Sequence, residues 1–319
     1  MERNLKSTEK MKFEAPTELS AKKGVVLAIA AAVISGWAVF INKFALANWT
    51  SSDIYTTEKN MVAALILTVV FAGFLYRKEI FGLPKKEWGR LALIGLIGGS
   101  LPFVLFFKGL SLASSSGAAF FHKTLFVWVA ILAIPILKEK LSKMQLFAFG
   151  ILIIGNISLF YPKELYFDTA GVLILTATVI WALENVLAKK FMNTISAPVM
   201  AWGRMFFGSI FLIGYLFFVG RGLELAHISL VQLPWLLLVG ITLFLYVTFW
   251  YSGLKRVPAV VATSILTIAS PITTVLNNIY SGVSLPANFW LIFSLILLGI
   301  VTLTFGSLRN SYNAKKSLI

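Results

Sequence analysis

The chain has 319 residues, of which 58% are hydrophobic and 13% charged, with a formal net charge of +15 and no cysteine. A soluble domain of this size is about half apolar and about a quarter charged, so the composition excludes a water-soluble protein. The lack of cysteine excludes a disulfide framework and any thiolate metal site. Apolar runs recur from Val25 to Phe305, which indicates a chain that crosses a membrane many times.

The first 23 residues are polar, and we expect them to form a disordered cytoplasmic tail. They lack the apolar core and cleavage site of a signal peptide, so the first apolar run is expected to remain as a membrane helix. A helix needs ~20 apolar residues to cross a bilayer. We therefore predict an all-α integral membrane protein with ten spans, at residues 25–46, 54–76, 89–110, 115–137, 143–161, 169–189, 197–219, 233–253, 258–281 and 288–307.

The positive charges alternate with these spans. One side holds the N-terminal tail, the loops that start at Arg77 and Lys138, two basic pairs at 189–190 and 255–256, and the C-terminal tail 308–319. The loops of the other side hold only Lys163 and Arg221 clear of the spans. Lysine and arginine concentrate on the cytoplasmic side of cell membranes, so both termini are predicted to be cytoplasmic. Orientation thus explains the net charge, and no nucleic-acid partner is expected.

The two halves of the chain repeat at a shift of 144 residues. The shift places Trp37 on Trp181, Gly109 on Gly253, Leu141 on Leu285 and Gly155 on Gly299. Each half, 24–161 and 166–307, then holds five spans. Because five is odd, the second half must enter the membrane the opposite way round. Inverted repeats are typical of secondary transporters, whose solute site lies near the midplane between the halves.

Two stretches of the chain carry a resemblance to a known family. They are KGLSLASSSGAAFFHKTLFVWVAILAIPILKEKLS (Lys108–Ser142) and SGLKRVPAVVATSILTIASPITTVLNNIYSGVSLP (Ser252–Pro286). Both resemble the third-to-fourth span region of EamA-type proteins in the drug/metabolite transporter superfamily, although the second lacks the Lys and Glu of the loop. The resemblance implies two inverted five-helix halves and a central cavity lined mainly by spans 1, 3, 4, 6, 8 and 9, with spans 5 and 10 peripheral. It also implies metabolite export.

Span 9 carries a polar stripe at spacings of three and four: Ser264, Thr267, Ser270, Thr274, Asn277 and Ser281. In lipid such a stripe faces either a cavity or a neighbouring helix, and the stripe alone favours neither. Pro271 removes one backbone hydrogen bond and leaves the carbonyl of Thr267 without its partner, which predicts either a kink in this helix or a ligand-binding group. Pro102, beside glycines, predicts another kink in span 3.

Two ionisable side chains, His122 and Lys123, stand side by side inside span 4. The 144-residue shift places Lys123 on Thr267, so we expect Lys123 to face the cavity and bind an anion or an acid. The alternative is that its long side chain reaches the headgroups. Adjacent helical residues point about 100° apart, so His122 is expected to face a neighbouring helix.

Glu184 is the candidate acid, and it shares a face of span 6 with Trp181 and Asn185. We predict that it lines the cavity, where it can carry a proton as the coupling ion. The alternative places it at the cytoplasmic interface, paired with Lys189.

Aromatic and basic residues complete the candidates. Trp37, Tyr246 and Trp250 can stack on a solute, with ordinary packing as the alternative for each. Lys59 and Arg204 occupy near-equivalent places in the two halves, which favours a structural role near the membrane interface.

These residues predict a secondary transporter that moves an amino acid or a related carboxylate-bearing amphipathic solute by alternating access, as a monomer or weak homodimer. A cationic-drug exporter is the alternative within this class. The sequence shows no GxxxxGK[ST], HExxH or GxSxG motif, which disfavours an ATP-driven pump or an intramembrane enzyme, and no cofactor or metal is expected. A passive channel lacks the rings of charge that select ions.

Overall fold

A computed structural model describes residues 18–112, 121, 122, 124–159 and 168–316, and these residues are all helical or in connecting turns. Eight of the helical segments are long and apolar enough to cross a membrane, and two shorter apolar helices lie where spans 4 and 5 are predicted. The predicted all-α membrane fold is thereby confirmed. The first half comprises α1 (Glu18–Leu46), α2 (Ser52–Leu67) with η1 (Thr68–Leu75), α3 (Arg77–Phe81), α4 (Lys85–Ile94), η2 (Gly95–Ser100), α5 (Leu101–Leu112), α7 (Leu125–Leu137) and α8 (Lys143–Leu159).

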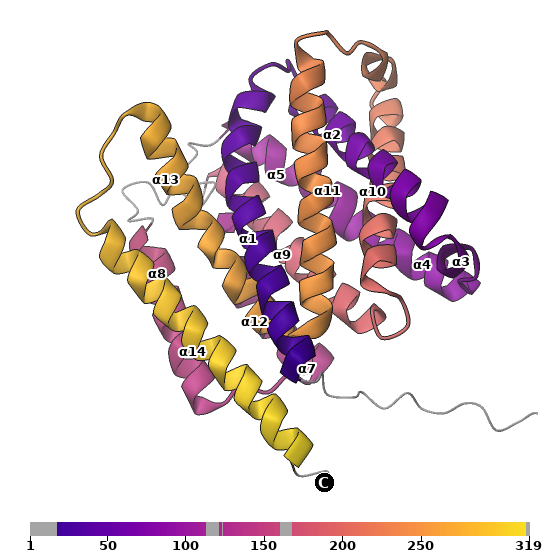
Figure 1. The fold of residues 1–319 in the computed structure, drawn as a ribbon. Helices are drawn as coiled ribbons and strands as arrows, with labels where there is room; N and C mark the ends of the chain where they lie inside the picture. The colour runs from indigo at the N-terminus through magenta and orange to yellow at the C-terminus, as the bar shows by residue number, and fades with distance from the viewer. Residues whose placement is uncertain (1–17, 113–120, 123, 160–167, 317–319) are drawn as a thin grey trace, which may run out of the picture.

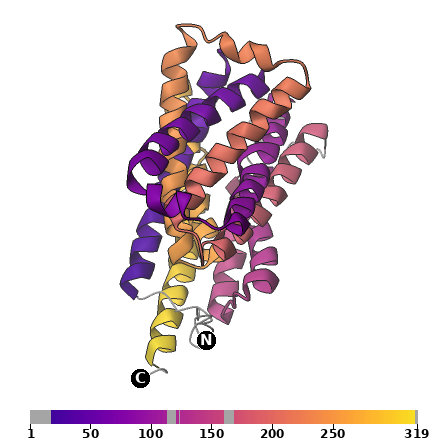
Figure 2. The ribbon, with the colours of Figure 1, turned by 90° about the vertical axis from the view of Figure 1, so that its right-hand side faces the viewer.

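The second half repeats the same order of long helices. It comprises α9 (Thr169–Phe191), α10 (Ala197–Phe218), η3 (Gly222–Ala226), α11 (Gln232–Arg256), α12 (Ala259–Ile265), η4 (Leu266–Ile268), α13 (Ala269–Ser281) and α14 (Phe289–Lys316). Figures 1 and 2 show that α1 begins and α14 ends at the same end of the bundle. An even number of crossings requires this arrangement, which fits two inverted five-helix repeats.

The terminal helices extend beyond the predicted spans. Helix α1 begins at Glu18, within the predicted N-terminal tail, and α14 continues to Lys316, through most of the predicted C-terminal tail. Neither extension contains Pro, which would end the helix, and the only glycine, Gly24, adjoins the start of the first apolar run. Hydropathy locates the apolar part of a helix, so it misses turns that continue outside the bilayer.

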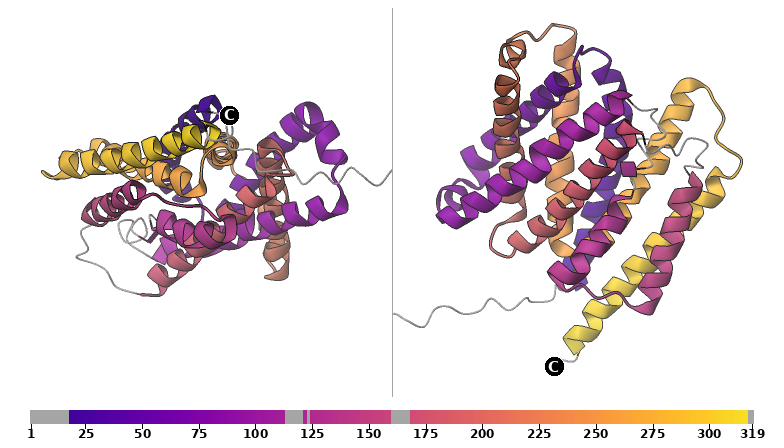
Figure 3. Two further views of the ribbon diagram at one scale, coloured as in Figure 1. Left: turned by 90° about the horizontal axis from the view of Figure 1, so that it is seen from below. Right: turned by 180° about the vertical axis from the view of Figure 1, so that it is seen from behind.

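Helices α8 and α14 pack against each other at one edge of the bundle, as the views of Figures 1 and 3 agree. The resemblance implied this peripheral place for spans 5 and 10. The remaining helices form the central bundle, in which α1 packs on α11 and α5 packs on α9. Each of these pairs joins one half of the chain to the other.

Large apolar side chains cover much of the outside of the bundle. Phe74, Phe218 and Leu230 are more than three-quarters exposed. Such exposure is unfavourable in water and is expected of a surface that faces lipid.

Two membrane helices are interrupted where the sequence predicts kinks. In span 9, the 3₁₀ turn η4 separates α12 from α13 just before Pro271, whose nitrogen cannot donate to a helical hydrogen bond. In span 3, the π-helical segment η2 ends immediately before Leu101 and Pro102. Wide helical turns of this kind occur frequently at functional sites.

Candidate functional site

The π-helical segment η2 turns the carbonyl oxygen of Gly98 toward the second half of the chain. That oxygen accepts two hydrogen bonds of 3.0 Å, one from Trp181 Nε1 and one from Arg204 Nη2. A Cβ atom at Gly98 would lie 2.5 Å from Glu184 Cγ, so a larger residue cannot occupy this position without displacing Glu184. The glycine therefore allows span 3 to approach a charged group of the other half.

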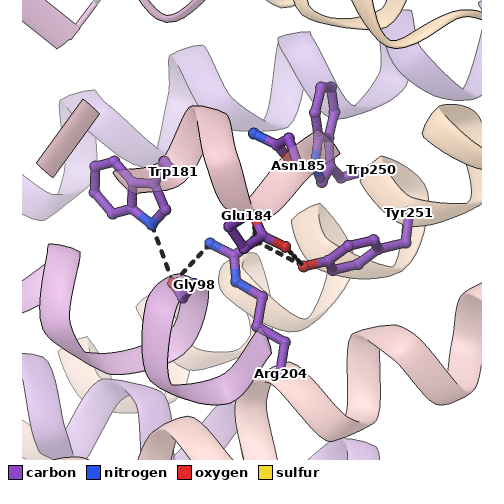
Figure 4. Close-up of polar contacts among 7 residues, drawn as sticks. All are labelled: Gly98, Trp181, Glu184, Asn185, Arg204, Trp250 and Tyr251. Atoms are coloured by element: carbon purple, nitrogen blue, oxygen red, sulfur yellow. Dashed lines mark hydrogen bonds and ion pairs between the residues drawn. The ribbon is translucent and has the colours of Figure 1, made fainter. Parts of the chain in front are cut away.

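Arg204 and Glu184 form a buried ion pair beside Gly98 (Figure 4). The closest nitrogen–oxygen distance, Arg204 Nη1 to Glu184 Oε2, is 3.9 Å. Tyr251 lies between them: its hydroxyl donates to Glu184 Oε1, and Arg204 Nη1 donates to the same hydroxyl at 3.4 Å. Glu184 is 0% and Arg204 5% exposed. Because both side chains are buried, the pair interacts in a medium of lower dielectric constant than water, where charges attract more strongly.

Glu184 is therefore buried inside the bundle and paired with Arg204 rather than with Lys189 at the interface, and its place on a solute cavity stays a prediction. Lys189 instead donates to the carbonyl oxygens of Leu254 and Val257, at 2.7 and 2.6 Å, at the C-terminal end of α11. Those carbonyls lack partners within their own helix. Lys189 thus stabilises a helix end.

Three further predicted residues lie beside the ion pair. Trp250 Nε1 donates to Asn185 Oδ1 at 2.9 Å, and the ring of Tyr246 stacks on that of Trp250 with the planes 9° apart. Trp250 and Asn185 are buried. The indole N–H of Trp250 and the amide oxygen of Asn185 are thus satisfied by each other.

A second buried cation, Lys59, lies on α2 and is 3% exposed. Its Nζ atom donates to Asn42 Oδ1 at 3.2 Å, and the hydroxyl of Tyr55 donates to the same oxygen. The rings of Phe107, Tyr55 and Phe103 surround Nζ, with centroids at 4.2, 5.1 and 5.4 Å. Lys59 and Arg204, expected near the membrane interface, are both buried.

Aromatic rings connect the two cations. The Phe103 centroid is 5.4 Å from Lys59 Nζ and 5.9 Å from Arg204 Cζ. Phe103 also contacts Trp181, whose ring meets that of His122 at 5.2 Å, edge to face. His122 therefore faces helix α9, in agreement with the prediction that it faces a neighbouring helix. Lys123 lies outside the described residues.

The other predicted residues are not brought to this group. Trp37 is 41% exposed and contacts Phe40 of its own helix. Thr267 and Ser270 are buried at the break in span 9, and the hydroxyl of Thr267 donates to the carbonyl of Ser264 one turn earlier. Their role in binding stays a prediction.

Sequence reasoning missed four members of the group: Lys59, Arg204, Tyr251 and Gly98. A signal for the two cations was present, because an ionisable residue inside an apolar span is by default a candidate for function. The near-equivalent positions of the two cations favour a structural role near the interface, whereas both side chains lie inside the bundle. A signal for Gly98 was also present, because Pro102, four residues later, has no N–H to donate to the Gly98 carbonyl.

The geometry defines a class of protein: a polytopic helical membrane protein of two inverted halves, with charges and aromatic rings buried where the halves meet. A family model described as the EamA-like transporter family matches residues 22–161 and 169–305. The chain belongs to this family of transporters. Each match covers one half of the chain.

Two curated relatives are similar along most of the chain. An uncharacterized transporter of Clostridium kluyveri is 27% identical over 265 residues, which covers 81% of this chain and 82% of the relative. The uncharacterized transporter YyaM of Bacillus subtilis is 24% identical over 299 residues, covering 91% and 96%. A solved structure titled "Crystal structure of protein" has a TM-score of 0.71 at 14% identity over 90% of this chain and 98% of its own, which shows a shared fold.

Proposed function

We propose that this transporter is a secondary active carrier that exports an amino acid or a related amphipathic carboxylate by alternating access. The observation that carries the proposal is the shared position of Phe103, with its ring close to both Lys59 and Arg204. A solute held there meets aromatic faces between two cationic groups. That environment suits a molecule with an apolar body and a negatively charged end.

The charges of the interior support an anionic rather than a cationic solute. A cationic drug would need a buried carboxylate that is free to receive it. Among the described residues of this group, Glu184 is paired with Arg204 and Tyr251, and the other buried acid nearby, Glu58, accepts a hydrogen bond from Trp49 Nε1 at 2.8 Å.

The proposal includes protons as the coupling ion, with Glu184 as their binding group. A proton on Glu184 would remove the charge that attracts Arg204, and would so loosen the contacts of α9 with α10 and α11. These contacts reach the first half through the Gly98 carbonyl. Proton binding and a movement between the halves would then be linked.

Two measurements on purified protein test these statements. In a thermal-shift screen of amino acids, organic acids and quaternary amines, we expect stabilisation by compounds that carry a carboxylate, followed by their accumulation against a gradient in proteoliposomes. Stabilisation by quaternary amines alone would overturn the choice of solute. For coupling, we expect Glu184→Gln protein at wild-type abundance to lose the pH dependence of transport, and an unchanged dependence would exclude Glu184 as the proton site.

A further inference from the structure

Lys59 is a buried cation to which the described part of the chain offers no anion. No carboxylate lies within 4.0 Å of its Nζ atom among these residues, and its one hydrogen bond goes to the Asn42 amide. The adjacent acid, Glu58, points elsewhere on the helix and accepts from Trp49. An ammonium group has three hydrogens to donate, so two of them remain for another acceptor.

The side chain points into the bundle. Lys59 is seven residues from the start of α2, which places it ~10 Å along that helix. A lysine that reached the headgroups would direct Nζ toward the helix end and would be exposed. Here Nζ lies among rings of α5 and against Asn42 of α1, and the residue is 3% exposed.

Comparison of the two halves shows that, among the described residues, Lys59 lacks a counterpart of the carboxylate that neutralises Arg204. The 144-residue shift relates Phe107, which faces Lys59, to Tyr251, which faces Arg204. It relates Phe40 to Glu184, the carboxylate that neutralises Arg204. The second half therefore supplies an anion to its cation, whereas the first half has an apolar residue at the corresponding position.

Retaining such a cation is costly, because an ion buried without its partner loses hydration that nothing replaces. The aromatic faces recover only part of this loss. A group that is unfavourable in the ligand-free protein and has free donors is suited to bind an anion that arrives from outside. Since the residue is closed off in this conformation, an anion reaches it only when the helices around it move, as alternating access requires.

We infer that Lys59 binds the carboxylate of the transported solute, while the rings of Tyr55, Phe103 and Phe107 contact its apolar part. The inference rests on the proposed carboxylate substrate and assigns the residue that recognises it. Asn42 positions the ammonium group, since its amide oxygen accepts from both Lys59 and Tyr55.

The test compares carboxylates with their own primary amides, which have the same shape and lack the negative charge. The probes are 3-phenylpropionate, L-phenylalanine and L-leucine, each beside its amide, added to purified full-length protein at fixed ionic strength. The variants are Lys59→Met, which keeps the length of the side chain, Lys59→Arg, which keeps the charge, and Lys108→Met as a matched control. Lys108 is an exposed cation next to Phe107.

We expect at least one carboxylate, and not its amide, to raise the melting temperature of the wild-type protein and of Lys108→Met. For Lys59→Met we expect the half-saturating concentration to rise at least tenfold, with partial recovery in Lys59→Arg. Without a probe, Lys59→Met should melt at the wild-type temperature or above it, because an unpaired buried charge has been removed.

Different failures separate the inference from the proposed function. Equal stabilisation of Lys59→Met and wild-type protein by a carboxylate would overturn the role of Lys59 and leave the proposed function in place. A Lys59→Met protein that fails to fold or melts well below the wild type would show a structural lysine, and would also overturn the role. Equal stabilisation by sodium chloride would show an unselective anion site. If no carboxylate stabilises the wild-type protein or is transported by it, both the proposed substrate class and the assignment of Lys59 as its binding residue are wrong.

Discussion

Arg204 and Lys59 occupy near-equivalent places in the two halves, but among the described residues only Arg204 has a carboxylate partner. Both are buried, and both lie close to the Phe103 ring. Arg204 has Glu184, Tyr251 and the Gly98 carbonyl as partners, whereas Lys59 has one amide oxygen and aromatic faces. The comparison indicates that an inverted repeat can conserve the position of a charge while its use changes. Arg204 links helices of both halves through its hydrogen bonds, whereas no carboxylate among the described residues pairs with Lys59.

The largest effect on stability is expected from removing Arg204, the cation that is paired with a carboxylate. Arg204→Met leaves the Glu184 carboxylate buried without a cation, so we expect the free energy of unfolding to fall by about 3–5 kcal/mol. Lys59→Met removes a charge that has no such partner and should cost far less. Denaturation of both proteins in the same detergent measures the difference.

A double variant sharpens this result. Arg204→Met combined with Glu184→Gln removes both charges, so its loss of stability should be smaller than the sum of the two single losses. Equal losses for Arg204→Met and Lys59→Met would contradict the distinction between the two cations.

The next largest effect on stability is expected at Gly98, where span 3 closely approaches the ion pair of Arg204 and Glu184. In Gly98→Ala the new methyl group would lie 2.5 Å from Glu184 Cγ and 3.2 Å from Arg204 Nε. The ion pair must shift to admit it, and overpacking of this kind costs about 1–3 kcal/mol. Gly214→Ala is the control, because a Cβ there meets nothing within 4 Å and alanine favours a helix. If both variants melt alike, the packing around Gly98 is looser than the structure indicates.

A smaller effect is expected at the end of the bundle where the charge asymmetry predicts the cytoplasm. Glu139, in the loop after α7, accepts hydrogen bonds from the backbone nitrogens of Ala259 and Val260, at 2.6 and 3.2 Å. It thereby caps α12 of the other half. Glu139→Ala should lower the free energy of unfolding by about 0.5–2 kcal/mol, as loss of a helix cap does. The exposed neighbour Lys140, changed to alanine, is the control. A null result for Glu139→Ala would show that this contact between the halves contributes nothing in solution.

Much of the fold could be predicted from the sequence, because the solvent imposes it. Apolar length sets the spans, and the helical period placed Trp181, Glu184 and Asn185 on one face. The partners of the cations could not be predicted in this way. Gly98 and Tyr251 come from helices distant in the sequence. Pro102 predicts a Gly98 carbonyl without its helical donor, but no local pattern predicts that Arg204 and Trp181 donate to that carbonyl.

The smallest effect is expected at the Arg221–Glu224 ion pair, outside the bundle. This pair tests whether burial or the nitrogen–oxygen distance determines how much an ion pair contributes to stability. Arg221 Nε and Nη2 donate to both carboxylate oxygens of Glu224 at 2.7 and 2.8 Å, much closer than the 3.9 Å of Arg204 and Glu184. Glu224→Gln should nevertheless shift the melting temperature less than any variant above, because water screens exposed charges.

The pH dependence of this exposed pair has a definite sign. The hydrogen bonds from Arg221 hold the pKa of the Glu224 carboxyl below its usual range. A lowered pKa in the folded state stabilises the protein above the unfolded value, about 4.3, and the contribution is lost as the pH falls through the folded value. The melting temperatures of wild type and Glu224→Gln should therefore differ slightly at pH 7 and converge in acid. If instead Glu224→Gln costs as much as Arg204→Met, then distance rather than burial governs these pairs, and the absence of a partner at Lys59 would lose its meaning.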